Sequence, residues 1–271
     1  MSAAPVEFAQ VDAGGRSLRL EIRWLGDPAS RWPTVVFLHE GLGSVAMWKD
    51  FPARLCADHG LRGLVYSRYG YGRSTPRPAA ERWAPDFMHV EAQVVLPELL
   101  DRLGIDRPWL FGHSDGGSIA LLYAARFDPA GLVVVAPHLF VEDVSIASIE
   151  QARRAYAETD LRSRLARYHD DPDSAFHGWN DIWLDPAFRD WRIDAALATI
   201  RAPILAVQGE DDEYGTLAQI RGIQDRLPQT RLCVMPQCGH SPHRDQPAQL
   251  SAEAGDFILR HSTPRPSGSP A

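Results

Sequence analysis

The feature that most limits the fold of this chain is a regular alternation of apolar runs with helical patterns. Continuous runs of Val, Leu, Ile and aromatic residues are typical of strands covered on both faces. Strands that alternate with helices predict an α/β fold with a mostly parallel, doubly wound sheet. The eight expected strands are residues 6–11, 18–25, 34–39, 61–67, 109–114, 132–137, 203–209 and 231–236. The first two are expected to form an antiparallel pair around a turn at residues 12–15.

Helical patterns occupy the connections between these strands. Residues 47–60 and 87–104 each end at a glycine, and residues 118–127 directly follow the fifth expected strand. In a sheet of this type, ligand chemistry is expected at the carboxyl ends of the parallel strands.

One segment interrupts the alternation. Residues 140–200 contain helical patterns and three tryptophans, Trp179, Trp183 and Trp191, but no strand pattern. We therefore expect a core domain of residues 1–139 and 201–262, a helical insertion at 140–200, and a mobile tail at 263–271 that is rich in Pro, Ser and Gly.

Charge and composition exclude several classes of partner. The net charge is −7 and the arginines are scattered, so the sequence offers no footprint for nucleic acid. No segment has the length and apolarity of a signal peptide or a membrane span, which predicts a soluble, cytoplasmic protein without membrane partners. The three cysteines lack metal-binding spacing, and neither a metal nor a cofactor is expected. The oligomeric state cannot be read from the sequence.

The most informative motif is Gly112-His113-Ser114-Asp115-Gly116, which lies between an expected strand and an expected helix. This G-x-S-x-G pattern is typical of a sharp turn that exposes a nucleophilic serine, because only glycine fits on either side of it. The helix that follows presents backbone N–H groups to developing negative charge. A serine that only begins a helix is the alternative. The context favours Ser114 as a nucleophile.

A serine nucleophile needs a base and an orienting carboxylate, expected in the order Ser, Asp or Glu, His. His240 follows the last expected strand and is the candidate base. An acidic run, Glu210-Asp211-Asp212-Glu213, follows the strand before it. Within this run Asp212 is favoured over Asp211 as the orienting acid. The backbone N–H groups of Asp115 and Gly41 are the expected oxyanion donors.

Taken together, these residues resemble the α/β-hydrolase superfamily, in particular its esterase, thioesterase and C–C-bond hydrolase branches with a small helical cap. The resemblance rests on four motifs: His39 to Gly43, Gly112 to Gly117, Gly209 to Asp212 and Gly239 to Pro247. It implies the α/β-hydrolase fold, with Ser114 as nucleophile, His240 as base, and Asp212, three residues after Gly209, as acid. It also implies that the insertion is a cap that shapes an acyl pocket.

The chain departs from the family pattern at two places. Glu40 occupies a position that is usually glycine, and its carboxylate either lies near the site or points away from it and pairs with an arginine. Residues 67–74 keep a glycine-rich turn but lack the family's usual Asp-Arg scaffold, which leaves the support of that loop unexplained. A serine at the elbow excludes the dehalogenase and epoxide hydrolase branches, which need an aspartate there.

The implied activity is hydrolysis of a carboxylic ester or thioester of a small to medium acyl group, a small-molecule substrate. A C–C bond hydrolase of a vinylogous 1,3-diketone and a non-catalytic receptor are the alternatives. The expected pocket residues are Glu40, Leu42, His138, Phe140, Trp179 and Trp183. Five arginines of the insertion either contact an anionic substrate, such as a CoA thioester, or form a solvated helix face: Arg153, Arg154, Arg162, Arg164 and Arg167.

Overall fold

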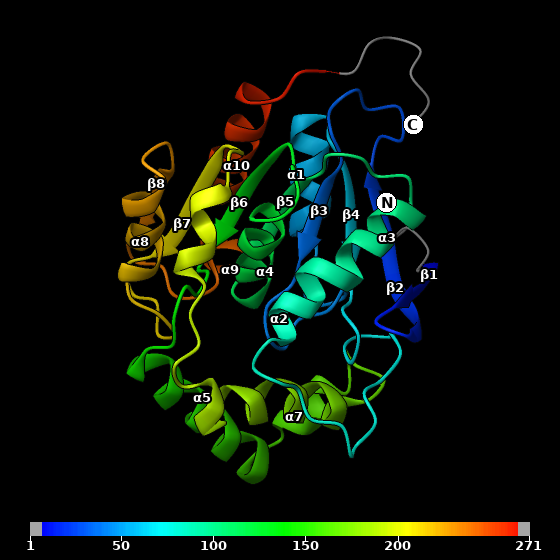
Figure 1. Ribbon diagram of the computed structural model, residues 1–271, viewed down its shortest axis with the longest axis vertical. Helices are drawn as coiled ribbons and strands as arrows, with labels where there is room; N and C mark the ends of the chain where they lie inside the picture. Colours follow the sequence, from blue (N-terminus) through cyan, green and yellow to red (C-terminus); the bar gives the residue numbers. More distant parts are fainter. Residues whose placement is uncertain (1–6, 265–271) are drawn as a thin grey trace.

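The computed structural model describes residues 7–264, and its centre is one eight-stranded sheet (Figure 1). The strand order is β1-β2-β4-β3-β5-β6-β7-β8; the β1–β2 and β2–β4 pairs are antiparallel and all other pairs are parallel. The predicted α/β sheet and its antiparallel opening pair are confirmed. The strands are β1 (Glu7–Ala13), β2 (Arg16–Gly26), β3 (Val35–Leu38), β4 (Arg62–Tyr66), β5 (Trp109–His113), β6 (Gly131–Val135), β7 (Ile204–Gly209) and β8 (Arg231–Met235).

Helices cover both faces of the sheet, which explains why its central strands are apolar throughout. On one face, α1 (Phe51–His59) and α10 (Pro247–Arg260) pack Leu55 and Phe257 into one core cluster. On the other face, α3 (Leu96–Arg102), α4 (Asp115–Ala124) and α8 (Ala218–Arg226) contribute to a second cluster. A short helix, α9 (Pro242–Asp245), precedes α10.

Two helix predictions differ from the structure in detail. Helix α1 begins at Phe51, not at Met47, because Pro52 lies in its first turn, where a missing N–H costs no hydrogen bond. Residues 87–102 form a continuous run of α2 (Phe87–Val90), the π-helical turn η1 (Glu91–Val95) and α3. Pro97 at the start of α3 lacks an N–H, and the wider π turn directly before it accommodates that break in the α-helical pattern.

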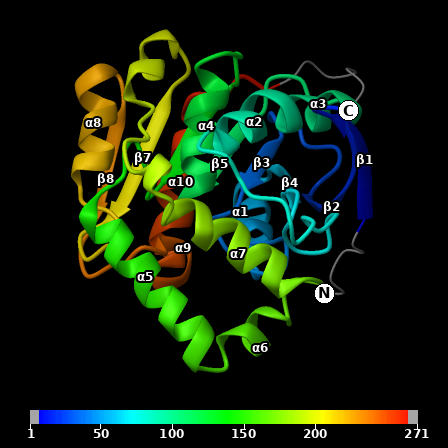
Figure 2. The same cartoon turned by 60° about the horizontal axis from the view of Figure 1, so that its bottom comes forward.

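Between β6 and β7 the chain leaves the sheet and forms the inserted helices, α5 (Asp143–Glu158), α6 (Leu161–Leu165) and α7 (Pro172–Trp183). Two 3-10 turns, η2 (Pro186–Phe188) and η3 (Asp194–Thr199), lead back to the core. Figure 2 shows α5, α6 and α7 together on one end of the molecule. Residues 265–271 of the expected tail lie outside the described residues. No helix among residues 7–264 is long and apolar enough to cross a membrane.

Candidate active site

Ser114 lies on a strained turn between β5 and α4. Its backbone has φ 54° and ψ −120°, a conformation that non-glycine residues rarely adopt. A Cβ on Gly112 would stand 2.2 Å from the carbonyl oxygen of Gly116, and one on Gly116 would stand 2.1 Å from that of Leu38. Both flanking glycines are therefore required for the turn that carries Ser114.

His240 and Asp212 meet at the neighbouring strand ends. His240 Nδ1 lies 2.8 Å from Asp212 Oδ1, so the Nδ1–H group donates a hydrogen bond to the carboxylate. In the neutral imidazole, Nε2 then carries the lone pair. Asp211 is exposed, and its backbone N–H instead donates to the carbonyl of Cys238. The structure thus brings Asp212, and not Asp211, to the candidate base.

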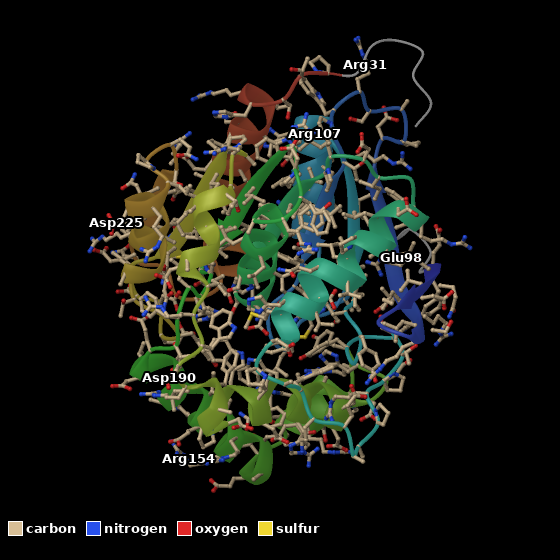
Figure 3. The ribbon with its side chains drawn as sticks, in the orientation of Figure 1. Arg31, Glu98, Arg107, Arg154, Asp190 and Asp225 are labelled. Atoms are coloured by element: carbon tan, nitrogen blue, oxygen red, sulfur yellow. The ribbon has the colours of Figure 1, made fainter. Side chains whose placement is uncertain are left out.

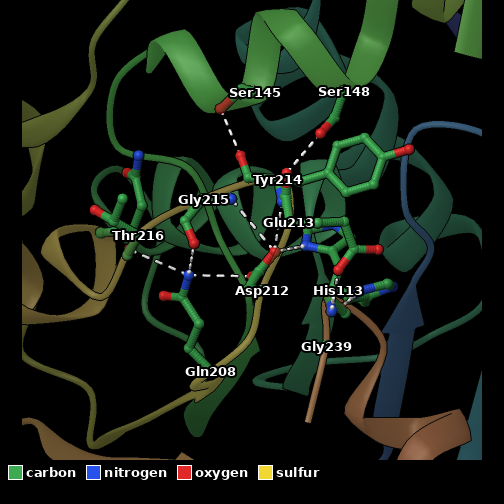
Figure 4. A network of polar contacts seen from close by, with 12 residues as sticks. His113, Ser145, Ser148, Gln208, Asp212, Glu213, Tyr214, Gly215, Thr216 and Gly239 are labelled. Carbon is green, nitrogen blue, oxygen red and sulfur yellow. Dashed lines mark hydrogen bonds and ion pairs between the residues drawn. The ribbon is translucent and has the colours of Figure 1, made fainter. Parts of the chain in front are cut away.

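A network of hydrogen bonds holds the Asp212 carboxylate in place (Figure 4). Oδ1 also accepts from the backbone N–H of Tyr214 at 2.8 Å, and Oδ2 accepts from Gln208 Nε2 at 3.1 Å. Burial raises the pKa of Asp212, but His240 and the Tyr214 N–H outweigh burial and hold it below its usual value. Ser145 and Ser148 of α5 donate to the carbonyls of Tyr214 and Glu213, which ties the inserted helices to this loop.

The backbone of His240 is anchored from two sides. His113 Nε2 donates to the His240 carbonyl at 2.7 Å, and the His240 N–H donates to Glu213 Oε2 at 3.0 Å. His113 is the second residue of the elbow motif and is buried. A direct hydrogen bond therefore joins the serine turn to the histidine loop, which lie more than 120 residues apart in the chain.

Ser114 and His240 line one cavity of about 380 Å³, which lies between the sheet and the inserted helices. A volume of this size suits a small ligand. Of the residues expected in the pocket, five lie in its wall together with Gly41: Glu40, Leu42, His138, Trp179 and Trp183.

Phe140 is not among the residues that line this cavity. Its backbone pairs with Arg192 in an isolated bridge, and its carbonyl accepts from Gln219 Nε2 at 3.1 Å. Trp191 stacks on Phe188 with ring centroids 5.1 Å apart, so it packs within the insertion.

Asp115 begins α4, where the backbone N–H has no acceptor within the helix. Its side chain is fully buried and accepts a hydrogen bond from Trp183 Nε1 at 3.2 Å. The guanidinium of Arg68, also buried, lies 3.7 Å away. Burial raises the pKa of Asp115, against the opposing effects of Arg68 and Trp183. These contacts connect the elbow to the loop after β4 and to α7.

Glu40 lines the cavity and also pairs with an arginine, Arg244, so it does not point away from the site as the second alternative expected. Its Oε1 lies 3.2 Å from Arg244 Nη2, and its Oε2 lies 3.6 Å from His113 Nδ1. Burial acts to raise the pKa of Glu40, but His113 and Arg244 hold it well below its usual value.

His138 is a second histidine in the cavity wall. Its ring lies 4.8 Å from that of Trp183 and 6.0 Å from that of His240, measured between centroids. Burial, helped by the charge of His240, lowers the pKa of His138 to about 3. His138 is therefore neutral at neutral pH and adds no positive charge to the site.

The loop at residues 67–74 is supported by a carboxylate from another part of the chain. Glu21, buried in β2, accepts from Ser67 Oγ at 2.7 Å and from the backbone N–H of Arg73 at 3.0 Å. His169 of the insertion accepts from the Gly72 N–H and contacts the Leu42 carbonyl at 3.1 Å. Sequence reasoning missed Glu21 and His169, because neither lies near a motif.

Sequence reasoning also missed part of the cavity wall. Tyr214 has its ring 4.7 Å from that of His240, and Arg244 pairs with Glu40. Tyr214 lies two residues after Asp212, and Arg244 lies within the motif that contains His240, so closeness to the motifs was the available signal. Ile149 and Leu165 of the insertion also line the cavity; only their place on helix faces hinted at burial.

Comparison with known proteins identifies the family of the chain. The model of the alpha/beta hydrolase family matches residues 35–254. The pimeloyl-[acyl-carrier protein] methyl ester esterase of Aromatoleum aromaticum is 26% identical over 83% of this chain and 98% of its own length. The proline iminopeptidase of Thermoplasma volcanium is 26% identical over 75% of this chain and 81% of its own length.

A solved structure shows the same fold. The esterase from Thermogutta terrifontis superimposes with a TM-score of 0.72, at 19% identity, over 95% of this chain and all of the other. At this identity the likeness concerns the fold alone. The family model covers most of the chain, including the elbow, the acidic loop and the histidine loop. This protein belongs to the alpha/beta hydrolase family.

Proposed function

We propose that the protein is a serine hydrolase that cleaves a carboxylic ester or thioester through an acyl-serine intermediate. His240 Nε2 takes the proton of Ser114 Oγ as the oxygen attacks the acyl carbonyl, and Asp212 stabilises the imidazolium that forms. The leaving group departs with that proton. A water then attacks the acyl-serine while His240 takes its proton, which releases the carboxylic acid and restores Ser114.

The proposal assigns the oxyanion to the backbone N–H groups of Gly41 and Asp115. Asp115 directly follows the nucleophile and stands at the first position of α4, where the positive end of the helix dipole favours negative charge. Gly41 lies in the wall of the same cavity, in the loop after β3.

Residues 140–200 serve as a cap over the acyl pocket in this proposal. Trp179 and Trp183 reach from α7 into the cavity wall, and Leu42 and His138 reach into it from the core. The apolar part of this wall and the cavity volume of about 380 Å³ favour a small to medium acyl group.

The observation that carries the proposal is the convergence of three groups at one cavity. Ser114 stands on a strained turn, His240 Nδ1 is bonded to the buried Asp212, and both Ser114 and His240 line the space that a substrate would enter. The esterase and iminopeptidase names of the relatives support hydrolysis as the reaction class.

Steady-state hydrolysis by the wild type and by Ser114→Ala tests the proposal. The substrates are aliphatic and aromatic esters, the corresponding CoA thioesters and a vinylogous 1,3-diketone. We expect turnover of esters or thioesters that Ser114→Ala lowers by about 10³-fold or more. Preference for the diketone would instead identify a C–C hydrolase. Absence of turnover and of Ser114 labelling by a fluorophosphonate would favour a receptor.

A further inference from the structure

Positive charge gathers at one side of the candidate active-site cavity. Arg164, Arg167 and Tyr168, at the end of α6 and just beyond it, line this cavity. Lys49 Nζ donates to the Tyr168 hydroxyl at 2.7 Å and lies 4.0 Å from the centre of its ring. We call Lys49, Arg164, Arg167 and Tyr168 the rim cluster.

The carboxylates nearby leave most of this charge uncompensated. Arg164 Nε lies 3.8 Å from Asp160, and both side chains are more than half exposed, so this pair is weak. Within residues 7–264, neither Arg167 nor Lys49 has a carboxylate within ion-pair distance; Arg167 Nε donates to the carbonyl of Arg164 at 3.4 Å, and its guanidinium lies 5.8 Å from the centre of the Tyr168 ring.

The two acids in the cavity wall are already engaged elsewhere. Glu40 pairs with Arg244 and lies 3.6 Å from His113 Nδ1, and Glu213 accepts from the His240 N–H. Among the described residues, neither acid lies within ion-pair distance of Arg164 or Arg167.

Tyr168 lies beside three cations, Lys49, Arg167 and Arg244. Its hydroxyl is surface-accessible, yet the hydrogen bond and charge of Lys49, with smaller contributions from Arg167 and Arg244, lower its pKa below the usual value. Lys49 and Arg167 therefore both act on Tyr168, and Arg164 lines the same cavity. In a chain with a net charge of −7, such a local excess of cations attracts anions selectively.

Much of the rest of the cavity wall is apolar. Leu42, Met47, Ile149, Leu161 and Leu165 line it. A molecule that fills the cavity would place an apolar segment against these side chains and a charged end at the rim cluster.

We infer that the substrate carries an anionic group, a carboxylate or a phosphate, which Arg164 and Arg167 bind while the acyl carbonyl lies at Ser114. This inference rests on the proposed hydrolase function and narrows its substrate class. The inference gives the arginines of the insertion different roles. Arg162 is paired with Asp173 at 2.6 Å, and Arg154 lies on the outer edge of the insertion (Figure 3), so neither belongs to the rim cluster.

Matched substrates that differ in charge test the inference. In one arm, the neutral 4-nitrophenyl hexanoate is compared with the mono-4-nitrophenyl ester of adipic acid, which has the same chain length and a terminal carboxylate. In the other, S-hexanoyl-N-acetylcysteamine is compared with hexanoyl-CoA, whose phosphates lie on the leaving group. The arms distinguish a charge on the acyl group from a charge on the leaving group.

We expect kcat/KM of the wild type to favour the anionic member of at least one pair by about three- to tenfold, as for a charge-assisted hydrogen bond at a partly exposed site. The double variant Arg164→Gln/Arg167→Gln should abolish that ratio, Arg167→Lys should retain part of it, and added salt should reduce it. Arg154→Gln is the matched control and should keep the wild-type ratio. Equal rates within both pairs, or a preference that survives the double variant, would overturn the inference.

Binding to the Ser114→Ala variant separates this inference from the hydrolase proposal. Quenching of tryptophan fluorescence reports occupancy, because Trp179 and Trp183 line the cavity. Tighter binding of the adipate monoester or hexanoyl-CoA than of its neutral partner, lost when Arg164 and Arg167 are also changed to Gln, supports the anion site even if the wild type hydrolyses nothing. Equal binding of both members of each pair contradicts it, whatever the wild type hydrolyses.

Discussion

Gly41 packs closely against the indole of Trp179: a Cβ on Gly41 would stand 2.1 Å from Trp179 Cδ1. This contact joins the loop after β3 to helix α7 of the insertion, two segments far apart in the chain. The proposed oxyanion donor, Gly41, thus packs directly against Trp179 of the proposed substrate wall.

Gly41→Ala should lower activity because the added methyl group overlaps the Trp179 ring. Either the loop or α7 must shift, and a displacement of about 1 Å near reacting atoms can cost about 100-fold in rate. We expect kcat to fall at least tenfold, with much of the loss restored in Gly41→Ala/Trp179→Ala, where room is available. Ester hydrolysis by the four proteins of this cycle measures it. Full activity of the single variant would argue against Gly41 as an oxyanion donor.

Asp212→Asn and Asp211→Asn form a matched pair one residue apart. The Asp212 carboxylate accepts a hydrogen bond from the Nδ1–H group of His240. An amide in its place loses the negative charge and permits the tautomer of His240 in which Nε2 carries the proton. We expect Asp212→Asn to lower kcat by about 10³- to 10⁴-fold, and Asp211→Asn to change it less than threefold. Initial rates with one activated ester are sufficient. A large loss in both variants would point to disruption of the whole acidic loop.

Glu21→Ala should destabilise the fold, although Glu21 does not line the active-site cavity. The substitution leaves Ser67 Oγ and the Arg73 N–H without their buried acceptor, at a cost of about 2 kcal/mol of unfolding free energy. Glu7→Ala, at an exposed position on β1, is the control and should stay within about 0.5 kcal/mol. Urea unfolding monitored by circular dichroism gives both values. Equal stability of the two variants would show that Glu21 does not support the loop.

Buried histidines should make the protein less stable in mild acid. The pKa is lowered to about 3 in His138 and to about 4 in His169, in both cases mainly by burial. Because the unfolded chain binds protons at these positions near pH 6.5 and the folded chain does not, the unfolding free energy falls as the pH drops from 6.5 toward 4. Each such histidine contributes up to about 1.4 kcal/mol per pH unit.

Urea unfolding of the wild type and His138→Gln between pH 7.5 and 4.5 measures this dependence. His138→Gln should flatten the slope by about one proton, with His177→Gln, at an exposed position of α7, as the control. Parallel stability curves for the wild type and His138→Gln would contradict the assignment of a neutral, buried His138.

The periodicity of the sequence predicted all eight strands and the antiparallel opening pair, because apolar runs and turn residues are local properties of the chain. The elbow was equally local. Gly112 and Gly116 must be glycine because backbone atoms, a few residues away or on the adjacent strand, leave no room for a Cβ. The motif and its strand–helix context therefore predicted the turn at Ser114. Local signals were weaker at element ends, as the start of α1 and the π turn before Pro97 show.

What the sequence determined by itself was therefore the sheet, the family motifs and a short set of candidate residues. Only the tertiary structure decided which acid meets His240, that Glu40 pairs with Arg244, that Phe140 lies outside the cavity wall, and that Glu21 supports a loop. It also singled out Arg164 and Arg167 among the arginines of the insertion. The physical reason is that these contacts form between side chains of distant segments, which only the packing of the fold brings together. Contacts of this kind produce no periodic pattern in the sequence.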